Sequence, residues 1–518
     1  MESEEQKKLN QIYLDIKAKI DEFIAGKMTA NELNHFVTVI GIYEQRNGKF
    51  MVRVRITGGH ITAETTNKLA AVMERNGIPY GHITSRQDIQ LHDVPADIIY
   101  KTVVECDQIG LPFRGGCGNT YRNILVSPDS GFASEQLFDV SSYAQQLNDV
   151  MRNYDRAFGL PRKFKIGFFA SPDEEFNTAL QDLGFLAVIK NGVRGFKVYS
   201  GGGMGRESVV GVKIFDFLPD HEAIRCAFAA TALFDEHGDR TNRNRARLRF
   251  VLEKLGAEAF VKLFMQYFDQ TTAPAVVPKN IDYSLVAADT FKNEEPAEGL
   301  SNWHKHAATP TGLGADYVAV RLYIPYGNLT PAQWRAVATL SKDFGNGFLR
   351  LMQPQDILLA PVHIDVLPAL HRRLLNDFPD LDLTLTSFKG HLLSCVGSDV
   401  CKIGILPAPE LADLIAKEMD QYLPADSPQK LEKLRFLTSQ LRISGCHNAC
   451  SGHPAAKIGI QGQKKRIAEK LEAVGIICTG VSDQPGSFSF SKPIEGADPV
   501  LIADLPGKVK TLLESQCS

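Results

Sequence analysis

The sequence predicts an α+β fold: one pseudo-twofold domain, built from two copies of the same unit, carrying two larger α/β domains. The chain has 518 residues, more than one hydrophobic core usually serves, so several compact units are expected. An offset of 268 residues, which places Phe50 on Val318, brings two similar stretches into register. We therefore expect five segments: 1–34 as a helical segment, 35–105 and 308–375 as the two copies, and 106–300 and 376–518 as the α/β domains.

Each copy shows a strand, a helix and a second strand. The first strand alternates apolar and polar residues, with apolar Phe50, Val52, Val54 and Ile56 in one copy and Val318, Val320, Leu322 and Ile324 in the other. In the second copy, Thr330, Pro331 and Gln333 read as the N-cap, the first helical residue and the capping-box partner. The first copy's helix is expected to stop at Asn76-Gly77. The pattern predicts two βαβ units.

The copies differ at polar positions. Arg55 corresponds to Tyr323, and Arg86 corresponds to Pro354. A packing role preserves only apolar residues, so arginines kept in one copy indicate that this copy faces an anion. A solvated sheet face explains this stretch equally well.

Composition excludes several classes of protein. Hydrophobic residues make up 44% of the chain and charged residues 23%, as in ordinary globular proteins. A net charge of -3 argues against a nucleic-acid-binding protein. The acidic start and the lack of a long apolar run favour the cytoplasm over a membrane or a secretory route.

Four of the nine cysteines form two pairs, C-x5-C and C-x3-C. These are Cys395 with Cys401, and Cys446 with Cys450. Four thiolates can hold a cubane iron-sulfur cluster, and the glycines around them let backbone N–H groups approach the sulfurs. A structural zinc site is the main alternative, although zinc usually takes tighter C-x2-C pairs. Four unrelated buried cysteines are the second alternative.

The remaining features receive structural interpretations. The first segment reads as an amphipathic packing helix, and the polar stretch 293–310 reads as a linker. Cys117 lies in a glycine loop that parallels the Cys395–Cys401 loop but has Asn123 where Cys401 stands. Surface charge is favoured for the three arginines that fall on one helical face, namely Arg240, Arg243 and Arg247.

With these residues in view, nearly the whole chain resembles the siroheme-dependent sulfite and nitrite reductases. The resemblance implies two fused ferredoxin-like halves that carry two α/β modules. It also implies that Cys395, Cys401, Cys446 and Cys450 hold a 4Fe-4S cluster, with Cys450 bridging to the siroheme iron. The family's usual proline after the third cysteine is His447 here, which affects the local turn more than the ligation.

The resemblance also assigns the basic residues. Arg53, Arg122, Lys163 and Lys165 are expected around the substrate side of the siroheme. Cations there attract an oxyanion, and a lysine flanked by cations gives up its proton more readily. The macrocycle carboxylates are expected to meet Arg55, Arg86, Gln90 and His92, with backbone N–H groups supplied by the glycine run that includes Gly202 and Gly203. Taken alone, each basic residue reads as solvated charge, and the glycine run as a tight turn.

The sequence thus predicts an oxidoreductase that reduces a small oxyanion by six electrons. Sulfite is favoured over nitrite because the lysine at position 165 resembles the sulfite-reducing branch of the family. Nitrite-reducing members commonly have asparagine at this position, and an extra cation favours the more charged anion. A non-catalytic iron-sulfur or zinc protein is the alternative from another class. No flavin or nicotinamide motif is evident, so a ferredoxin or a flavoprotein is expected as electron donor. The basic run Lys464–Arg466 reads as ordinary exposed charge, with ferredoxin docking as the alternative.

Overall fold

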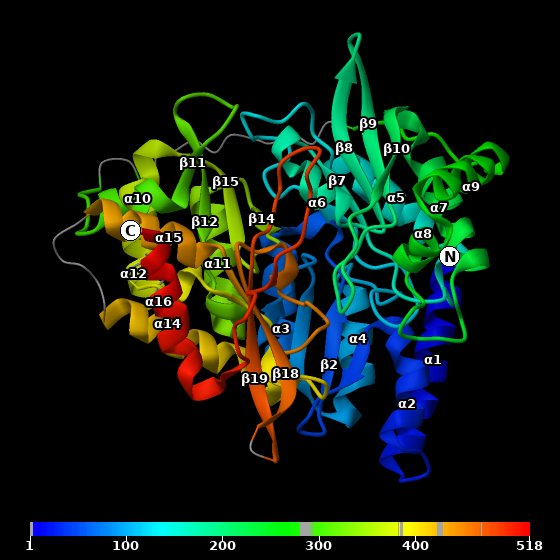
Figure 1. Ribbon diagram of the computed structural model, residues 1–518, viewed down its shortest axis with the longest axis horizontal. Helices are drawn as coiled ribbons and strands as arrows, with labels where there is room; N and C mark the ends of the chain where they lie inside the picture. The colour runs from blue at the N-terminus through cyan, green and yellow to red at the C-terminus, as the bar shows by residue number, and fades with distance from the viewer. Residues whose placement is uncertain are drawn as a thin grey trace.

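The computed structural model describes residues 4–279, 291, 294–381, 383, 387–421, 428–467 and 469–517 (Figure 1). Its buried apolar side chains form three large cores. One core belongs to the duplicated domain and the N-terminal helices, and each α/β domain has its own. The predicted α+β fold is confirmed.

The duplicated domain contains two five-stranded sheets, in the orders β1-β2-β5-β4-β13 and β11-β12-β15-β14-β3. The first sheet comprises β1 (Ile42–Glu44), β2 (Phe50–Val54), β4 (Gly81–Ile83), β5 (Ile89–Val94) and β13 (Asn328–Leu329), and the second comprises β3 (His60–Thr62), β11 (Ala308–Pro310), β12 (Tyr317–Leu322), β14 (Phe348–Leu351) and β15 (Ile357–His363). Each copy therefore lends one short strand to the sheet of the other, because β13 pairs with β4 and β3 pairs with β14.

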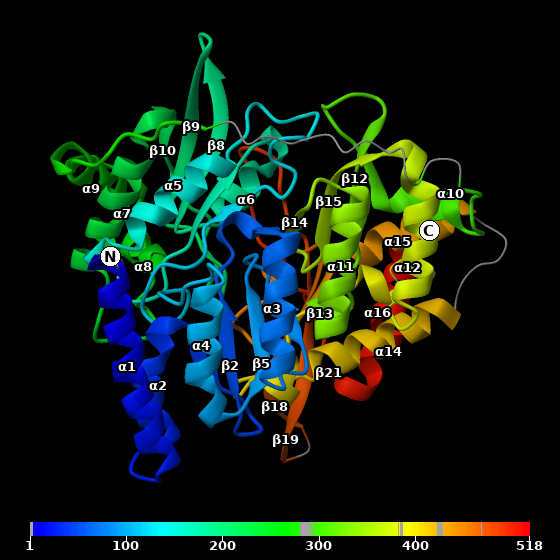
Figure 2. The ribbon, with the colours of Figure 1, turned by 180° about the vertical axis from the view of Figure 1, so that it is seen from behind.

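Helices cover these sheets on one side. They are α3 (Ala63–Arg75), α4 (Ile99–Gln108), α11 (Pro331–Phe344) and α12 (Leu367–Asp377). The corresponding helices α3 and α11 pack against each other, as Figure 2 shows. The expected caps are present: Thr330 and Gln333 form a capping box at α11, and α3 ends before Asn76 and the left-handed Gly77.

The N-terminal segment forms α1 (Glu4–Ile24) and α2 (Ala30–Val37). The apolar face of α1 includes Leu9, Ile16 and Ile20, which are buried in the core of the duplicated domain. This confirms that the predicted amphipathic helix has a packing role. A capping box between Thr29 and Glu32 starts α2.

The two α/β domains share one strand order. The first contains β6 (Leu125–Val126), β7 (Ile166–Phe169), β8 (Leu183–Lys190), β9 (Val193–Ser200) and β10 (Val212–Pro219), with α5 (Ser141–Met151), α6 (Glu175–Ala179), α7 (Ala223–His237), α8 (Leu248–Leu255) and α9 (Ala257–Gln270). The second contains β16 (Leu393–Ser394), β17 (Leu441–Ser444), β18 (Ile458–Ile467), β19 (Lys470–Thr479), β20 (Lys492–Pro493) and β21 (Val500–Leu501), with α13 (Gly397–Val400), α14 (Ala408–Gln421), α15 (Pro428–Ser439) and α16 (Leu505–Cys517).

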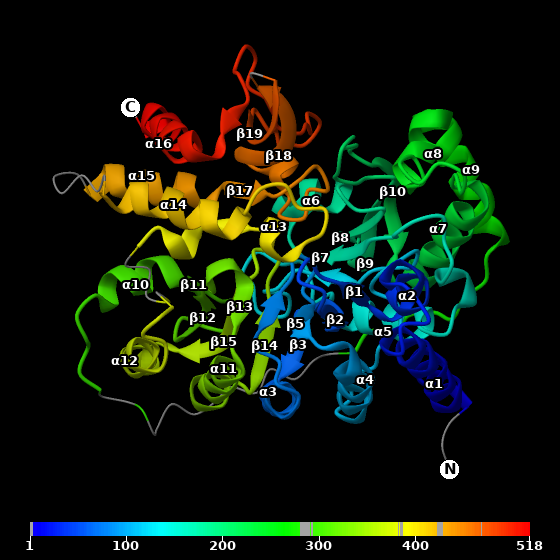
Figure 3. The ribbon, with the colours of Figure 1, turned by 90° about the horizontal axis from the view of Figure 1, so that it is seen from below.

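In each α/β domain three neighbouring parallel strands lead into an antiparallel pair. The duplication therefore extends beyond the half-domains into the α/β domains. Figure 3 shows the half-domains side by side below, with the second α/β domain above them and the first to the right.

The linker expected at 293–310 is corrected by the structure, because residues 300–310 form a helix and a strand. Residue 293 lies outside the described residues. Residues 300–307 form α10 (Leu300–Ala307), and β11 follows directly. Trp303 is fully buried against His371. One large aromatic side chain thus anchors a segment whose average composition is polar. None of the described helices has the length and apolar character needed to cross a bilayer.

The turns at the centre of the pseudo-twofold generate a stability prediction. A Cβ on the left-handed Gly59 would lie 2.5 Å from the Leu351 carbonyl oxygen, whereas a Cβ on the left-handed Gly77 meets nothing within 4 Å. We expect Gly77→Ala to cost only the backbone strain, about 1 kcal/mol. Gly59→Ala should lower the free energy of unfolding by at least twice as much, because the backbone at Leu351 of the other copy must move away from the new Cβ. Calorimetry should then show a correspondingly larger fall in unfolding temperature for Gly59→Ala than for Gly77→Ala. Equal shifts for the two variants would contradict this contact.

Candidate active site

The strand register brings the four cysteines together. Cys395 directly follows β16, and Cys401 follows the short helix α13. Cys446 and Cys450 lie in the loop after β17. Because β16 and β17 are parallel neighbours, both loops leave the same edge of the sheet.

The thiols interact electrostatically with one another. Burial raises the pKa of Cys395, Cys401 and Cys446, and the charge of Cys450 adds to the rise in each case. The Gly445 N–H donates to the Cys395 sulfur at 3.1 Å. Buried thiols of this kind become thiolates beside a strong cation, which cluster iron provides.

In the described part of the chain, no three His, Cys, Asp or Glu side chains converge on a position for one metal ion. A cubane offers a separate iron to each cysteine, so its ligands are spread over the width of the cluster. Four thiols that influence one another from two neighbouring loops match the four protein ligands of a cubane.

The first α/β domain has a counterpart of this site without sulfur. Ser127 follows β6 as Cys395 follows β16, and its Oγ accepts the Ala170 N–H at 2.9 Å, as the Cys395 sulfur accepts that of Gly445. Glu174 accepts a hydrogen bond from the same Ser127 hydroxyl. The counterpart of Cys395 is therefore Ser127, and the expected parallel with the Cys117 loop is corrected.

The four predicted substrate-side cations lie close enough to influence one another electrostatically, and of the four only Arg122 is fully buried. Arg53 comes from β2, Arg122 follows the glycine loop, and Lys163 and Lys165 precede β7. Phe164 is fully buried between the two lysines, which confirms that they alternate about it. Arg122 lowers the pKa of Lys163, and Lys163 lowers that of Lys165.

Cys450 connects these cations to the cysteine loops. Its charge contributes to the raised pKa of Arg53. At Lys163, the same charge opposes the fall in pKa that burial causes. The Ser85 hydroxyl donates to the Cys450 carbonyl at 2.7 Å, so the turn before β5 contacts the same loop. The cysteines and the cations therefore form one site at the meeting point of three domains.

Burial sets the protonation of the two lysines. Burial and the charge of Arg247 lower the pKa of Lys163 to about 7. Burial and Lys163 lower the pKa of Lys165 well below its ordinary value. An arriving anion favours the protonated form of both, so the pair can bind an anion and release protons to it.

The residues predicted to meet the macrocycle carboxylates lie in different surroundings. Gln90 and His92 are both on β5; the His92 ring stacks on Tyr80, and within the described structure neither of its ring nitrogens has a partner. Arg86 is enclosed by protein, donating to the Gln181 side chain and to the Asn123 and Ile166 carbonyls. The orphaned His92 nitrogens suit the acidic groups of a large ligand.

Arg55 interacts electrostatically with the buried Asp88, as Arg86 does, and its contact with the macrocycle carboxylates stays a prediction. Its guanidinium donates to the Arg114 carbonyl and to Asn148, and it covers the Tyr121 ring at 4.3 Å. It faces a separate cavity, described below.

Two cations were missed by the sequence analysis. Arg247 was interpreted as surface charge, but no helix spans 240–247, and Arg247 is 5% exposed in a 2.8 Å ion pair with the buried Asp182. A Cβ on Gly203 would lie 2.9 Å from the Arg247 guanidinium and 3.2 Å from that of Arg249. The glycine run that includes Gly203 therefore faces these two arginines. Strand-like alternation was the available signal, since arginine recurs at every second position: 243, 245, 247 and 249.

Four clustered thiols beside a group of interacting cations define a redox enzyme that handles a small anion. Two family models match the chain and together cover more than half of it. "Nitrite and sulphite reductase 4Fe-4S domain" matches residues 117–272, and "Nitrite/Sulfite reductase ferredoxin-like half domain" matches residues 43–99 and 312–377. The chain belongs to the nitrite and sulfite reductase family.

Known relatives carry both names. Ferredoxin–nitrite reductase of Synechococcus elongatus is 26% identical, covering 98% of this chain and 95% of that protein. The sulfite reductase [NADPH] hemoprotein beta-component of Acidithiobacillus ferrooxidans is 24% identical, covering 80% of this chain and 74% of that protein. The solved structure of the NirA protein of Mycobacterium tuberculosis has a TM-score of 0.78 at 20% identity, covers 98% of this chain and 93% of that one, and shows the same fold.

The family carries siroheme and a 4Fe-4S cluster, and the enzyme is an oxidoreductase. The 4Fe-4S domain model matches the first α/β domain, whereas the four cysteines lie in the second. The shared strand order explains this, because both domains are versions of one module. Fit to the cofactors is indicated by the set of four mutually interacting thiols and by buried polar atoms that lack partners among the described residues, at Arg53, His92 and Arg249.

The cysteine assignment predicts a selective loss of iron. Cys401→Ser should reduce the iron and acid-labile sulfide of the purified protein several-fold, because a hydroxyl is a poor ligand for cluster iron. Cys478→Ser is the control, since Cys478 is a buried free cysteine of the same domain that lies outside the set. Unchanged iron in Cys401→Ser, or equal loss in both variants, would remove Cys401 from the site.

Proposed function

We propose that this enzyme reduces sulfite to sulfide by six electrons. The observation that carries the proposal is the second lysine, Lys165. Lys165 lies beside Lys163, Arg86 and Arg247, so a proton taken up with the anion gives the site more positive charge than a monoanion needs. Sulfite, which is partly dianionic at neutral pH, gains more from that charge than nitrite does. Reduction of nitrite to ammonia is the second candidate, favoured by the similarity over 98% of the chain to the Synechococcus nitrite reductase.

The protein groups divide the work between them. We propose that Cys395, Cys401, Cys446 and Cys450 hold the cluster, and that Gln90, His92, Arg247 and the backbone around Gly202 and Gly203 hold the siroheme carboxylates. Arg86 and Arg249 are proposed for the same acidic groups. Together the two cofactors supply electrons one at a time to the bound anion.

Arg53 and Arg122 are proposed to hold the anion, and Lys163 and Lys165 to deliver protons. Both reactions consume at least one proton for each electron, so the protons must arrive without bulk water flooding the pocket. Lysines with lowered pKa values are suited to this, since each takes up a proton with the anion and passes it on.

We propose a separate donor protein, either a ferredoxin or a flavoprotein. The relatives' names support both, one being ferredoxin-dependent and the other a component of an NADPH enzyme. Reduction of the purified chain by NADPH alone, as fast as by a donor protein, would refute this.

The substrate proposal is tested by Lys165→Asn. Loss of the positive charge that Lys165 acquires with the bound anion should weaken sulfite reduction more than nitrite reduction, shifting the ratio of kcat/KM towards nitrite by about tenfold or more. Steady-state assays with reduced methyl viologen make the result independent of the donor. Lys197→Asn is the matched control, because Lys197 is paired with Glu175. An unchanged ratio in Lys165→Asn would sink the argument for sulfite.

The lowered pKa of Lys163 predicts a pH dependence. Its pKa of about 7 means that the side chain is charged below that pH and neutral above it. Anion binding needs the charged form, so kcat/KM should fall as pH rises through this region. In Lys163→Arg, the guanidinium stays charged and the fall should move to higher pH. Sulfite's own ionisation is the same for both enzymes, so coinciding pH profiles would exclude Lys163 as the titrating group.

A further inference from the structure

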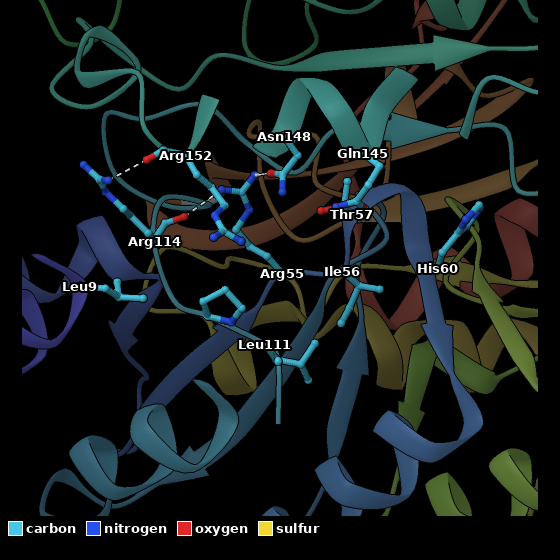
Figure 4. A pocket seen from close by; sticks show the side chains of 12 residues that line it. Leu9, Arg55, Ile56, Thr57, His60, Leu111, Arg114, Gln145, Asn148 and Arg152 are labelled. Carbon is cyan, nitrogen blue, oxygen red and sulfur yellow. Dashed lines mark hydrogen bonds between the residues drawn. The ribbon is translucent and has the colours of Figure 1, made fainter. Parts of the chain in front are cut away.

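A cationic cavity lies beside the glycine loop that contains Gly115, at the side chain of Arg55. It has a volume of about 180 Å³ and is enclosed by α1, the turn after β2, the segment 110–114 and helix α5 (Figure 4). Arg55, Arg114 and Arg152 line it. No part of the proposed reaction uses it.

The buried carboxylate that acts electrostatically on Arg55 is Asp88, which lies outside the lining of the cavity. None of the described residues that line it is Asp or Glu. Arg55 is held by the Arg114 carbonyl at 2.8 Å and the Asn148 amide oxygen at 2.9 Å. Arg114 covers the Phe158 ring at 4.2 Å and donates to the Arg152 carbonyl at 2.6 Å. Its only ion pair among the described residues is a 3.7 Å contact with the solvent-exposed Asp155, which also pairs with Lys8.

Carbonyl oxygens and aromatic faces orient a guanidinium but leave its charge intact. Two such guanidiniums in one cavity repel each other unless an anion lies between them. Three other polar groups in the lining, Thr57, His60 and Gln145, are uncharged. Thr57 and Gln145 do not ionise, and burial together with the charge of Arg350 holds the pKa of His60 well below its ordinary value. They can donate hydrogen bonds to such an anion.

The cavity is separate from the reaction pocket. A Cβ on Gly116 would lie 3.3 Å from Arg55 Cγ and 3.8 Å from Arg53 Cδ, so both side chains contact this loop, but only Arg55 lines the cavity. Arg53 faces Cys450, whereas Arg55 faces Asn148. The two positions thus serve two sites.

The volume selects the size of the ligand. Organic ligands usually occupy pockets of roughly 300–1,000 Å³, and a water molecule takes about 30 Å³. A cavity of about 180 Å³ therefore suits one small tetrahedral ion with a few waters. We propose that this cavity binds an inorganic oxyanion of the sulfate and phosphate class, at a site distinct from the reaction pocket and independent of whether sulfite or nitrite is reduced.

The direct test is anomalous diffraction from crystals of the complete enzyme, grown without sulfate or phosphate and soaked in selenate. We expect a selenium peak in the cavity near Arg55 and Arg114. The solution test compares the rise in unfolding temperature caused by sulfate, or separately by phosphate, with that caused by chloride at equal ionic strength.

Two variants probe the site in different ways. Arg114→Gln removes a cation, with Arg156→Gln as control, because Arg156 is an exposed arginine paired with Glu236 at 2.7 Å. Gln145→Glu adds a carboxylate at an exposed position of α5, so it tests the site without disturbing the core; Gln145→Leu is its neutral control. Both test variants should lose at least half of the sulfate-specific rise, and both controls should retain most of it. Absence of selenium from the cavity, or an undiminished rise in Gln145→Glu, would overturn the proposal.

Discussion

The site depends on positive charge that the protein buries but only partly neutralises. Two buried carboxylates do most of the neutralising. Asp88 pairs with Arg53 at 3.7 Å and also interacts with Arg55 and Arg86, whereas Asp182 pairs with Arg247 at 2.8 Å. Asp182 also accepts the Lys165 backbone N–H at 2.8 Å, which holds the lysine segment against this ion pair. The remaining positive charge requires anionic ligands, and a carboxylate-rich cofactor with an oxyanion substrate provides them. Charge balance therefore connects cofactor binding, substrate choice and the lowered lysine pKa values.

Duplication built this site, and divergence confined it to one side. The polar residues Gln90 and His92 of β5 correspond by the offset of 268 to Leu358 and Ala360 of β15. Those two pack with Phe132 in a small apolar cluster, so the equivalent face of the second copy is closed by side chains. The α/β domains diverged in the opposite sense, since the second has Cys395 where the first has Ser127. The cations of one half thus meet the thiols of the other.

Much of this could be predicted from local sequence patterns. The half-domains, the caps of α11 and the cysteine pairs depend on short-range periodicity and spacing, which a single sequence records. Arg247 was misjudged because a helical period was assumed where the chain runs extended into α8. The prediction of a linker was wrong because the buried side chain of Trp303 anchors a helix whose other residues are mostly polar. The position of Arg55 could not be predicted, because it depends on Asn148 and the Gly115 loop, which lie far away in the sequence.

The exchange of strands between the copies explains why the site has a rigid frame. Because β13 completes the first sheet and β3 the second, neither half-domain has a complete sheet without the other. His82 contacts Asn328 at 2.8 Å, and in the pseudo-equivalent position Arg350 contacts His60. The turn before β5, which carries Arg86 and reaches the Cys450 loop, is also held from the other copy, since Gln87 donates to the Leu351 carbonyl at 2.9 Å. The second copy has no matching polar face, yet it still sets the position of the residues proposed to bind cofactor and substrate in the first. Its contribution is mechanical: its strand β13 completes the sheet that carries those residues.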